Sequence, residues 1–272
     1  MYLKFFIPFL YAYQTRMGGS LVGLLKWIAE YLLPVFVLYV YVSSYRIYSV
    51  LVFILGVLLV YNLYEIGYIW NDTITIRKEK SPTLRLSERE LEYFYQNPLF
   101  VLLFRIVLSV FVSILIYSNP FYSVGIWALI FSWSILIVYY FYNRFRNRFN
   151  FVLHFVLLTL RYSCPWFFFS GENDIWMLLL ITCIIYPFPI MLEIISKRKF
   201  GVRFRFTDRY LPDYSKRHQF RVVYYLCLTC TSVLGWWIFG FDLLFLLLSL
   251  YLLFYNCIFN FLQSRILSDG LE

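Results

Sequence analysis

The sequence contains apolar runs that are too long and too continuous for a soluble protein. Two of them extend from Phe100 to Tyr117 and from Leu243 to Phe259. An α-helix needs about 20 residues to cross the hydrocarbon core of a bilayer, whereas a strand of a membrane β-barrel has about 10 residues of alternating polarity. These runs do not alternate in polarity. The sequence therefore predicts an all-α, polytopic bundle of transmembrane helices.

The composition indicates that lipid, and not water, is the main solvent of this chain. Of its 272 residues, 62% are hydrophobic and only 14% are charged, which is too little charge to cover a soluble surface of this size. The net charge is +9, but no soluble basic domain is present to bind nucleic acid, so we expect no nucleic-acid partner. Membrane lipid with anionic headgroups, or an anionic substrate, explains the charge better.

We expect about eight spans in a single membrane-embedded domain that covers residues 1–272. The stretch before the first span is interrupted by Pro8, Arg16 and two glycines, so we expect it to be an interfacial lead-in. No cleavage site follows Lys4, and the first span is expected to act as an uncleaved insertion signal. The expected spans are 21–42, 47–70, 98–118, 121–142, 151–170, 175–194, 221–239 and 241–262.

The basic residues predict an orientation for these spans. With the N-terminus in the cytoplasm, nearly all of the 24 Lys and Arg residues fall on the cytoplasmic side, as the positive-inside rule requires. We therefore expect a multi-pass integral membrane protein with its basic loops and both termini in the cytoplasm. The two longest cytoplasmic loops, 71–97 and 195–220, are expected to cap any active-site cavity.

Four ionisable residues fall at membrane depth in this arrangement. They are Glu65, Arg105, Arg161 and Glu193. A charge at this depth is costly unless it faces a polar cavity or pairs with a neighbour. Each is therefore a candidate functional residue, and pairing between helices is an equally good explanation of each.

The first long loop begins with a polar motif. Asn71-Asp72 ends the second expected span, Glu79 follows, and Lys80-Ser81-Pro82 comes next. This motif resembles that of the UbiA superfamily of intramembrane prenyltransferases, in which the second span ends in the pattern NDxxDxxxD. Thr75 stands in place of the middle acid.

The resemblance implies a UbiA-like fold and the transfer of a prenyl group from a polyprenyl diphosphate. Mg²⁺ prefers hard oxygen ligands and would make the diphosphate a better leaving group. Asp72 would be the principal Mg²⁺ ligand, with Glu79 and Asn71 as secondary ligands. Basic residues would neutralise the remaining phosphate charge, and the candidates are Arg77, Lys78, Lys80, Arg144 and Lys197.

The similarity continues in later spans. The family's YxxxK segment corresponds to Tyr140 and Arg144, and arginine keeps the charge while offering a fork suited to phosphate. Thr159-Leu160-Arg161, followed by Ser170-Gly171, resembles the branch of the family that transfers phosphoribosyl groups onto polyprenyl phosphate, which makes Arg161 a candidate substrate-binding residue. Glu193 takes the place of the first acid in the family's second metal motif. Lys197 stands where the second acid is expected, and its charge disfavours a metal ion.

Two functions therefore stay open. The first is an enzyme that uses Mg²⁺ at Asp72 and Glu79 to transfer a prenyl or phosphoribosyl group, and the carboxylates rank it ahead. The second is a catalytically inactive UbiA-like subunit that binds a lipid phosphate or a membrane-protein partner, which Lys197 favours.

Overall fold

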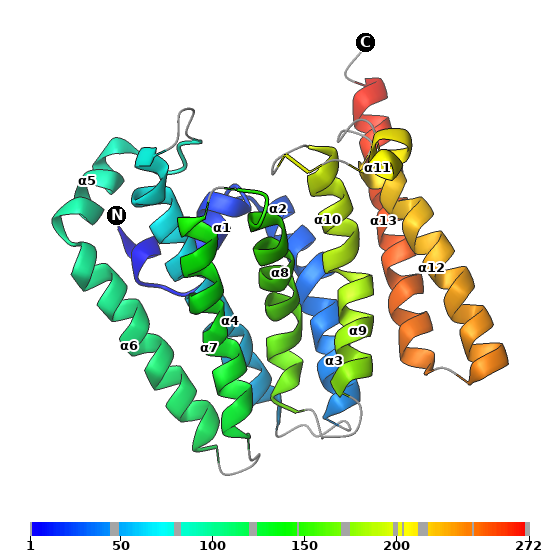
Figure 1. The fold of residues 1–272 in the computed structure, drawn as a ribbon, viewed down its shortest axis with the longest axis horizontal. Coiled ribbons are helices and arrows are strands. Elements are labelled where there is room, and N and C mark those ends of the chain that lie inside the picture. Colours follow the sequence, from blue (N-terminus) through cyan, green and yellow to red (C-terminus); the bar gives the residue numbers. More distant parts are fainter. Residues whose placement is uncertain are drawn as a thin grey trace. The chain divides into compact units, whose positions relative to one another are not determined.

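The computed structural model describes residues 2–43, 49–78, 83–119, 124–145, 147–169, 175–197, 201–202, 204–211, 217–240 and 242–269. All regular structure within these ranges is helical, which confirms the prediction of an all-α chain. The chain forms two compact units, Met1–Ile175 and Trp176–Glu272, called unit 1 and unit 2 below (Figure 1). The single embedded domain stays a prediction.

Seven helical segments in the described residues are long and apolar enough to cross a membrane. They are Leu21–Val42, Val50–Arg77, Pro98–Tyr117, Ile126–Arg144, Ile175–Ser196, Arg217–Phe239 and Leu243–Phe261. The fifth expected span corresponds to α8 (Asn150–Phe167), which is not among the seven. His154, Arg161 and Pro165 interrupt its apolar sequence. The chain is thus a multi-pass helical protein by length and composition, and the count of eight spans stays a prediction.

Unit 1 is built around α4 (Val50–Thr73), which contacts α6 (Pro98–Tyr117), α7 (Ile126–Arg144), α8 and α1 (Leu10–Arg16). Small residues on α4 permit this close packing. A Cβ atom on Gly67 would lie 2.3 Å from Cγ of Tyr139 on α7. Helix contacts of this kind in membranes depend on small side chains, because the backbones must approach one another.

The N-terminal segment packs within unit 1, and its expected place at the membrane interface stays a prediction. It comprises a short 3₁₀-helix, η1 (Leu3–Phe5), and α1. Phe5 and Tyr11 are fully buried in one cluster with Ile69, Phe94 and Val101. Arg16, the charged residue that interrupts this segment, is a partner of Asp72 on α4, and 20% of its side chain is exposed.

The first candidate span is not a regular α-helix throughout. It consists of α2 (Leu21–Trp27), a π-helical turn η2 (Ile28–Leu32) and α3 (Leu33–Val42). Ser20 caps α2 by accepting a hydrogen bond from the Gly23 amide at 3.1 Å. Such π-turns inside helices are rare and frequently occur at functional sites.

A short amphipathic helix, α5 (Glu88–Gln96), lies between α4 and α6 in the chain. It begins with a capping box, in which Ser87 and Glu90 satisfy each other's backbone amides. Lys4 forms a salt bridge with Glu90 at 2.6 Å, so α5 also holds the N-terminal segment.

Unit 2 contains α9 (Ile175–Ile185), α10 (Pro187–Ser196), α11 (Arg205–Tyr210) and a helix pair, α12 (Arg217–Phe239) with α13 (Leu243–Asp269). Pro187 and Pro189 break the span between α9 and α10. Proline has no amide hydrogen, so Pro189 leaves the Ile185 carbonyl without its helical donor. The hydroxyl of Tyr225 donates to that carbonyl at 2.9 Å.

Candidate functional site

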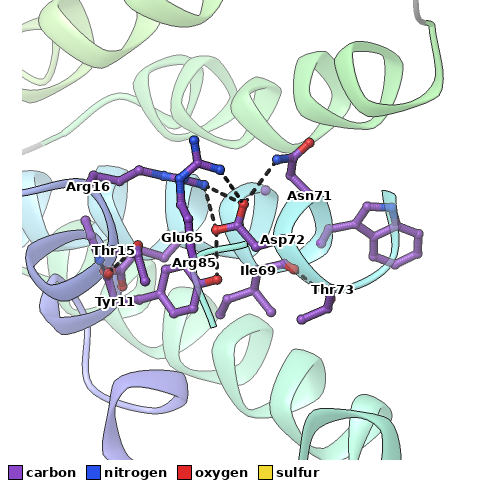
Figure 2. Close-up of polar contacts among 12 residues, drawn as sticks. Tyr11, Thr15, Arg16, Glu65, Ile69, Asn71, Asp72, Thr73 and Arg85 are labelled. Carbon is purple, nitrogen blue, oxygen red and sulfur yellow. Dashed lines mark hydrogen bonds and ion pairs between the residues drawn. The ribbon is translucent and has the colours of Figure 1, made fainter. Parts of the chain in front are cut away.

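The Asp72 carboxylate lies at one end of α4 and has four side-chain partners (Figure 2). Arg16 Nη2 donates to both carboxylate oxygens at 2.9 and 2.8 Å, and Arg85 Nη1 donates to Oδ1 at 3.2 Å. The Tyr11 hydroxyl donates to Oδ2 at 3.0 Å, and Asn71 Nδ2 donates to Oδ1 at 3.2 Å. We call these five residues the Asp72 cluster.

The charges of the Asp72 cluster do not cancel. One carboxylate faces two guanidinium groups, so the cluster carries an excess of positive charge. The Asp72 side chain has no exposed surface, whereas 20% of the Arg16 side chain and 33% of the Arg85 side chain are exposed. An approaching ligand therefore meets the arginines and not the carboxylate.

The ionisation of the groups around Asp72 agrees with this arrangement. Burial lowers the pKa of Arg16, but the charge of Asp72, its hydrogen bond with Arg16, and the neighbouring Tyr68 and Tyr11 together more than offset burial, so the pKa lies above its ordinary value. Burial and the neighbouring Asp72 charge raise the pKa of the Tyr11 hydroxyl well above its ordinary value. At neutral pH, Arg16 is thus charged and Tyr11 is a neutral donor.

Glu65, one of the ionisable residues predicted at membrane depth, places Arg16 next to Asp72. Its carboxylate accepts hydrogen bonds from the backbone amides of Phe9 at 2.9 Å and Ala12 at 2.7 Å. These amides belong to the N-terminal end of α1, where a negative charge stabilises a helix. Arg16 ends α1, so fixing its first turn on α4 brings Arg16 to Asp72.

Arg105, the second such residue, is completely buried and pairs with Glu65 at 2.7 Å. Its other hydrogen bonds go to Asn62 Oδ1 and to the backbone carbonyls of Phe5, Lys4 and Ile7, at 2.7 to 3.1 Å. The charged pair therefore binds the N-terminal segment through its backbone. Pairing between helices, one of the two explanations open for these residues, is the arrangement observed for Glu65 and Arg105.

Arg161 on α8 is surrounded by aromatic rings. Its Cζ lies 4.9, 5.1 and 5.7 Å from the ring centroids of Tyr31, Tyr61 and Tyr64. Its Nη2 donates to the Tyr61 hydroxyl, which also accepts a hydrogen bond from Trp27 Nε1. We call these five residues the Arg161 cage. None of the described carboxylates forms a salt bridge with Arg161.

Glu193 lies in unit 2 on α10 and pairs with Arg221 of α12, with Arg221 Nε 2.5 Å from Glu193 Oε1. Lys197 follows directly after α10 and is exposed. Both residues belong to unit 2, whereas the residues of the Asp72 cluster belong to unit 1.

The remaining candidates lie outside these clusters. Arg144 donates from Nη1 to the Tyr140 hydroxyl at 2.6 Å, and Tyr140 lines a cavity of about 150 Å³ between α4 and α7. The Arg77 guanidinium lies 3.7 Å from the ring centroid of Tyr95. Lys78 ends η4 (Thr75–Lys78). Glu79 and Lys80 lie outside the described residues.

The described side chains near Asp72 do not fit Mg²⁺. Both carboxylate oxygens accept hydrogen bonds from guanidinium groups, and a divalent cation would have to displace them against their positive charge. Within the described residues, no three His, Cys, Asp or Glu side chains gather as metal ligands would. The Mg²⁺ requirement stays a prediction, and its second carboxylate, Glu79, is outside the described residues.

No known protein family, curated protein or solved structure matches this chain. The residues that sequence reasoning missed are Tyr11, Arg16 and Arg85 as partners of Asp72. In the sequence, Arg16 and Arg85 are only two of many basic residues in segments predicted to be cytoplasmic. The available signal was that Arg16 and Arg85 are predicted on the same side of the membrane as Asp72, whose carboxylate needs basic partners if it is buried.

Proposed function

We propose that this chain is a membrane protein that binds a lipid phosphate at the Asp72 cluster without a resident metal ion. The observation that carries the proposal is the pairing of a fully buried Asp72 with two partly exposed arginines. Arginine binds phosphate oxygens through paired N–H groups, and charge-assisted hydrogen bonds of this kind are strong. The excess positive charge of the cluster complements an anion.

The exposed surface of α6 and α7 is apolar and would suit the hydrocarbon tail of such a lipid. Many large apolar side chains on α6 and α7 are exposed at the surface of unit 1, including Leu99, Phe100 and Trp127. An apolar groove of about 660 Å³ runs between these helices, lined by Val110, Ile114, Ile130 and Trp133 among others. A lipid phosphate, such as a polyprenyl phosphate, combines the anionic group and the apolar chain that these surfaces suit. The chain would then have the second function left open by the sequence, that of a catalytically inactive UbiA-like subunit that binds a lipid phosphate.

The second candidate is the Mg²⁺-dependent transferase. Its support is the pair formed by Asn71 and Asp72, which begins the family-like motif and lies with its side chains 3.2 Å apart. This function requires Arg16 and Arg85 to release Asp72 when metal and diphosphate bind. The two candidates therefore differ in their dependence on Mg²⁺.

Binding of farnesyl phosphate to the purified chain in nanodiscs of zwitterionic lipid tests the proposal. We expect saturable binding in EDTA, and an approximately tenfold weaker affinity in Arg85→Gln because one charge-assisted hydrogen bond is worth about 1.5–3 kcal/mol. Arg89→Gln is the matched control, since Arg89 is an exposed arginine of α5 outside the cluster.

Asp72→Asn separates the two candidates. For direct phosphate binding, this change removes a competitor for the arginines, so affinity should be retained or increased. Binding that is absent in EDTA, appears with Mg²⁺ and is lost in Asp72→Asn would overturn the proposal and favour the transferase.

A further inference from the structure

Arg161 carries a positive charge inside unit 1 that no described carboxylate balances. Its Nη2 is hydrogen-bonded to Tyr61, but its Nε is buried with no hydrogen-bond partner in the described part of the chain. Cation–π contacts with three tyrosine rings stabilise the charge, yet they use none of its N–H groups. An arginine at membrane depth with unused donors indicates a polar ligand.

The Tyr61 hydroxyl also has an unused donor. The hydroxyls of Tyr31 and Tyr64, by contrast, donate to the backbone carbonyls of Arg161 and Leu157. The Tyr61 oxygen accepts hydrogen bonds from both Trp27 and Arg161, so its two lone pairs are occupied. Its own hydrogen has no acceptor among the described residues. Arg161 and Tyr61 thus present donors side by side, and only an acceptor can satisfy both.

Two of the three helical segments that carry the Arg161 cage deviate from regular geometry near Arg161. Tyr31 lies in the π-helical turn η2, which shifts its side chain relative to a regular helix. On α8, Pro165 has no amide hydrogen to donate to the carbonyl of Arg161, four residues earlier. The Tyr31 hydroxyl donates to that same carbonyl at 3.1 Å. The Tyr31 hydroxyl, from the π-helical turn, thus replaces the donor that Pro165 lacks, and this contact holds the Arg161 backbone in place.

We propose that the Arg161 cage is a second binding site, which takes the oxyanion of a small amphiphile between Arg161 and the Tyr61 hydroxyl. The phosphate or carboxylate oxygens accept from Arg161 and from the free hydrogen of Tyr61. The rings of Tyr31, Tyr61 and Tyr64, all nearly fully buried, exclude water around the pair and strengthen it. The Arg161 cage shares no residue with the Asp72 cluster, and this proposal does not depend on the lipid-phosphate function proposed there.

Calorimetric titration of the full chain in zwitterionic nanodiscs with dodecyl phosphate, dodecanoate and inorganic phosphate tests this proposal. We expect at least one of the two amphiphiles to bind more tightly than inorganic phosphate. Arg161→Gln should weaken that binding at least tenfold. Arg161→Lys should weaken it also, because lysine keeps the charge but lacks the fork. Equal affinity for inorganic phosphate would identify free phosphate as the source of the oxyanion.

Tyr61→Phe keeps the proposal testable if the Arg161 variants do not fold. It retains the ring and removes only the hydroxyl, and we expect it to weaken amphiphile binding several-fold. Unchanged affinity in Tyr61→Phe, or no binding of any of the three probes to the native chain, overturns the proposal.

Arg85→Gln separates this site from the Asp72 cluster. It should weaken farnesyl phosphate binding and leave binding at the Arg161 cage unchanged, so each proposal can fail while the other holds. A loss of both affinities in Arg85→Gln would overturn the assignment of two separate sites.

Discussion

Neutralising Glu65 should loosen the N-terminal segment and destabilise unit 1. Glu65 is completely buried, balances Arg105 and accepts two backbone amides of the N-terminal segment. In Glu65→Gln, the new amide side chain keeps one acceptor oxygen. Its NH₂ group faces the N–H donors that the carboxylate bound, and it cannot accept hydrogen bonds from them. The Arg105 charge is then left unpaired among its remaining neutral partners.

The size of the effect follows from the burial of both partners. Removing one partner of a buried ion pair costs about 3–5 kcal/mol. For a domain of this size, each kcal/mol lowers the Tm by about 2–4 °C, so Glu65→Gln should lower the Tm by roughly 6–20 °C. Arg105→Met should cost more, because it also removes the arginine donor of the Lys4 and Phe5 backbone carbonyls.

Thermal unfolding of the nanodisc-embedded chain, with intrinsic fluorescence as readout, measures the Tm. Limited proteolysis should in parallel show faster cleavage within residues 2–17 of Glu65→Gln. The double variant Glu65→Gln/Arg105→Met should be less destabilised than the two single variants together, by about 1–3 kcal/mol. Glu88→Gln is the control, since Glu88 is exposed on α5. A Glu65→Gln variant that is as stable as this control would refute the reasoning.

Two further predictions concern helix packing and pH. Gly67→Ala should lower stability by about 1–3 kcal/mol in the same thermal assay, because its Cβ would overlap the Tyr139 ring, whereas Gly125→Ala, with open space around it, should not. Partial burial tends to raise the pKa of Glu90, but hydrogen bonds from Lys4 and the Ser87 amide lower it below its ordinary 4.5. The stabilisation by Glu90 is therefore present above about pH 4.5 and is lost as the pH falls through the lowered value. The Tm difference between the native chain and Glu90→Gln should shrink over that range, and a constant difference would contradict it.

The helices and their membrane character were predictable because both depend on local properties of the chain. Continuous apolar runs such as Leu243 to Phe259 identify helices without reference to any other segment. The sequence also singled out Glu65 and Arg105, since a charge at membrane depth must have a partner. Their mutual pairing could not be read from the pattern, because the two residues are far apart in the chain.

The structure of the N-terminal segment could not be predicted for a different reason. Glu65 and Arg105 bind its backbone amides and carbonyls, which every residue has, so no side-chain pattern announces the contact. Arg16 likewise reads as an ordinary basic residue of a cytoplasmic segment. Its role depends on α1 lying against α4, which is a property of the tertiary fold. Asp72 was predicted as a candidate site residue, but its arginine partners were not.

The binding of the N-terminal segment by Arg105 has a consequence for biosynthesis. Residues 2–17 leave the ribosome before α4 and α6, to which the groups that hold them belong. The opening residues must therefore wait, unanchored, until the third candidate span has entered the bilayer. This segment thus reaches its final position only after helices that are translated later than it.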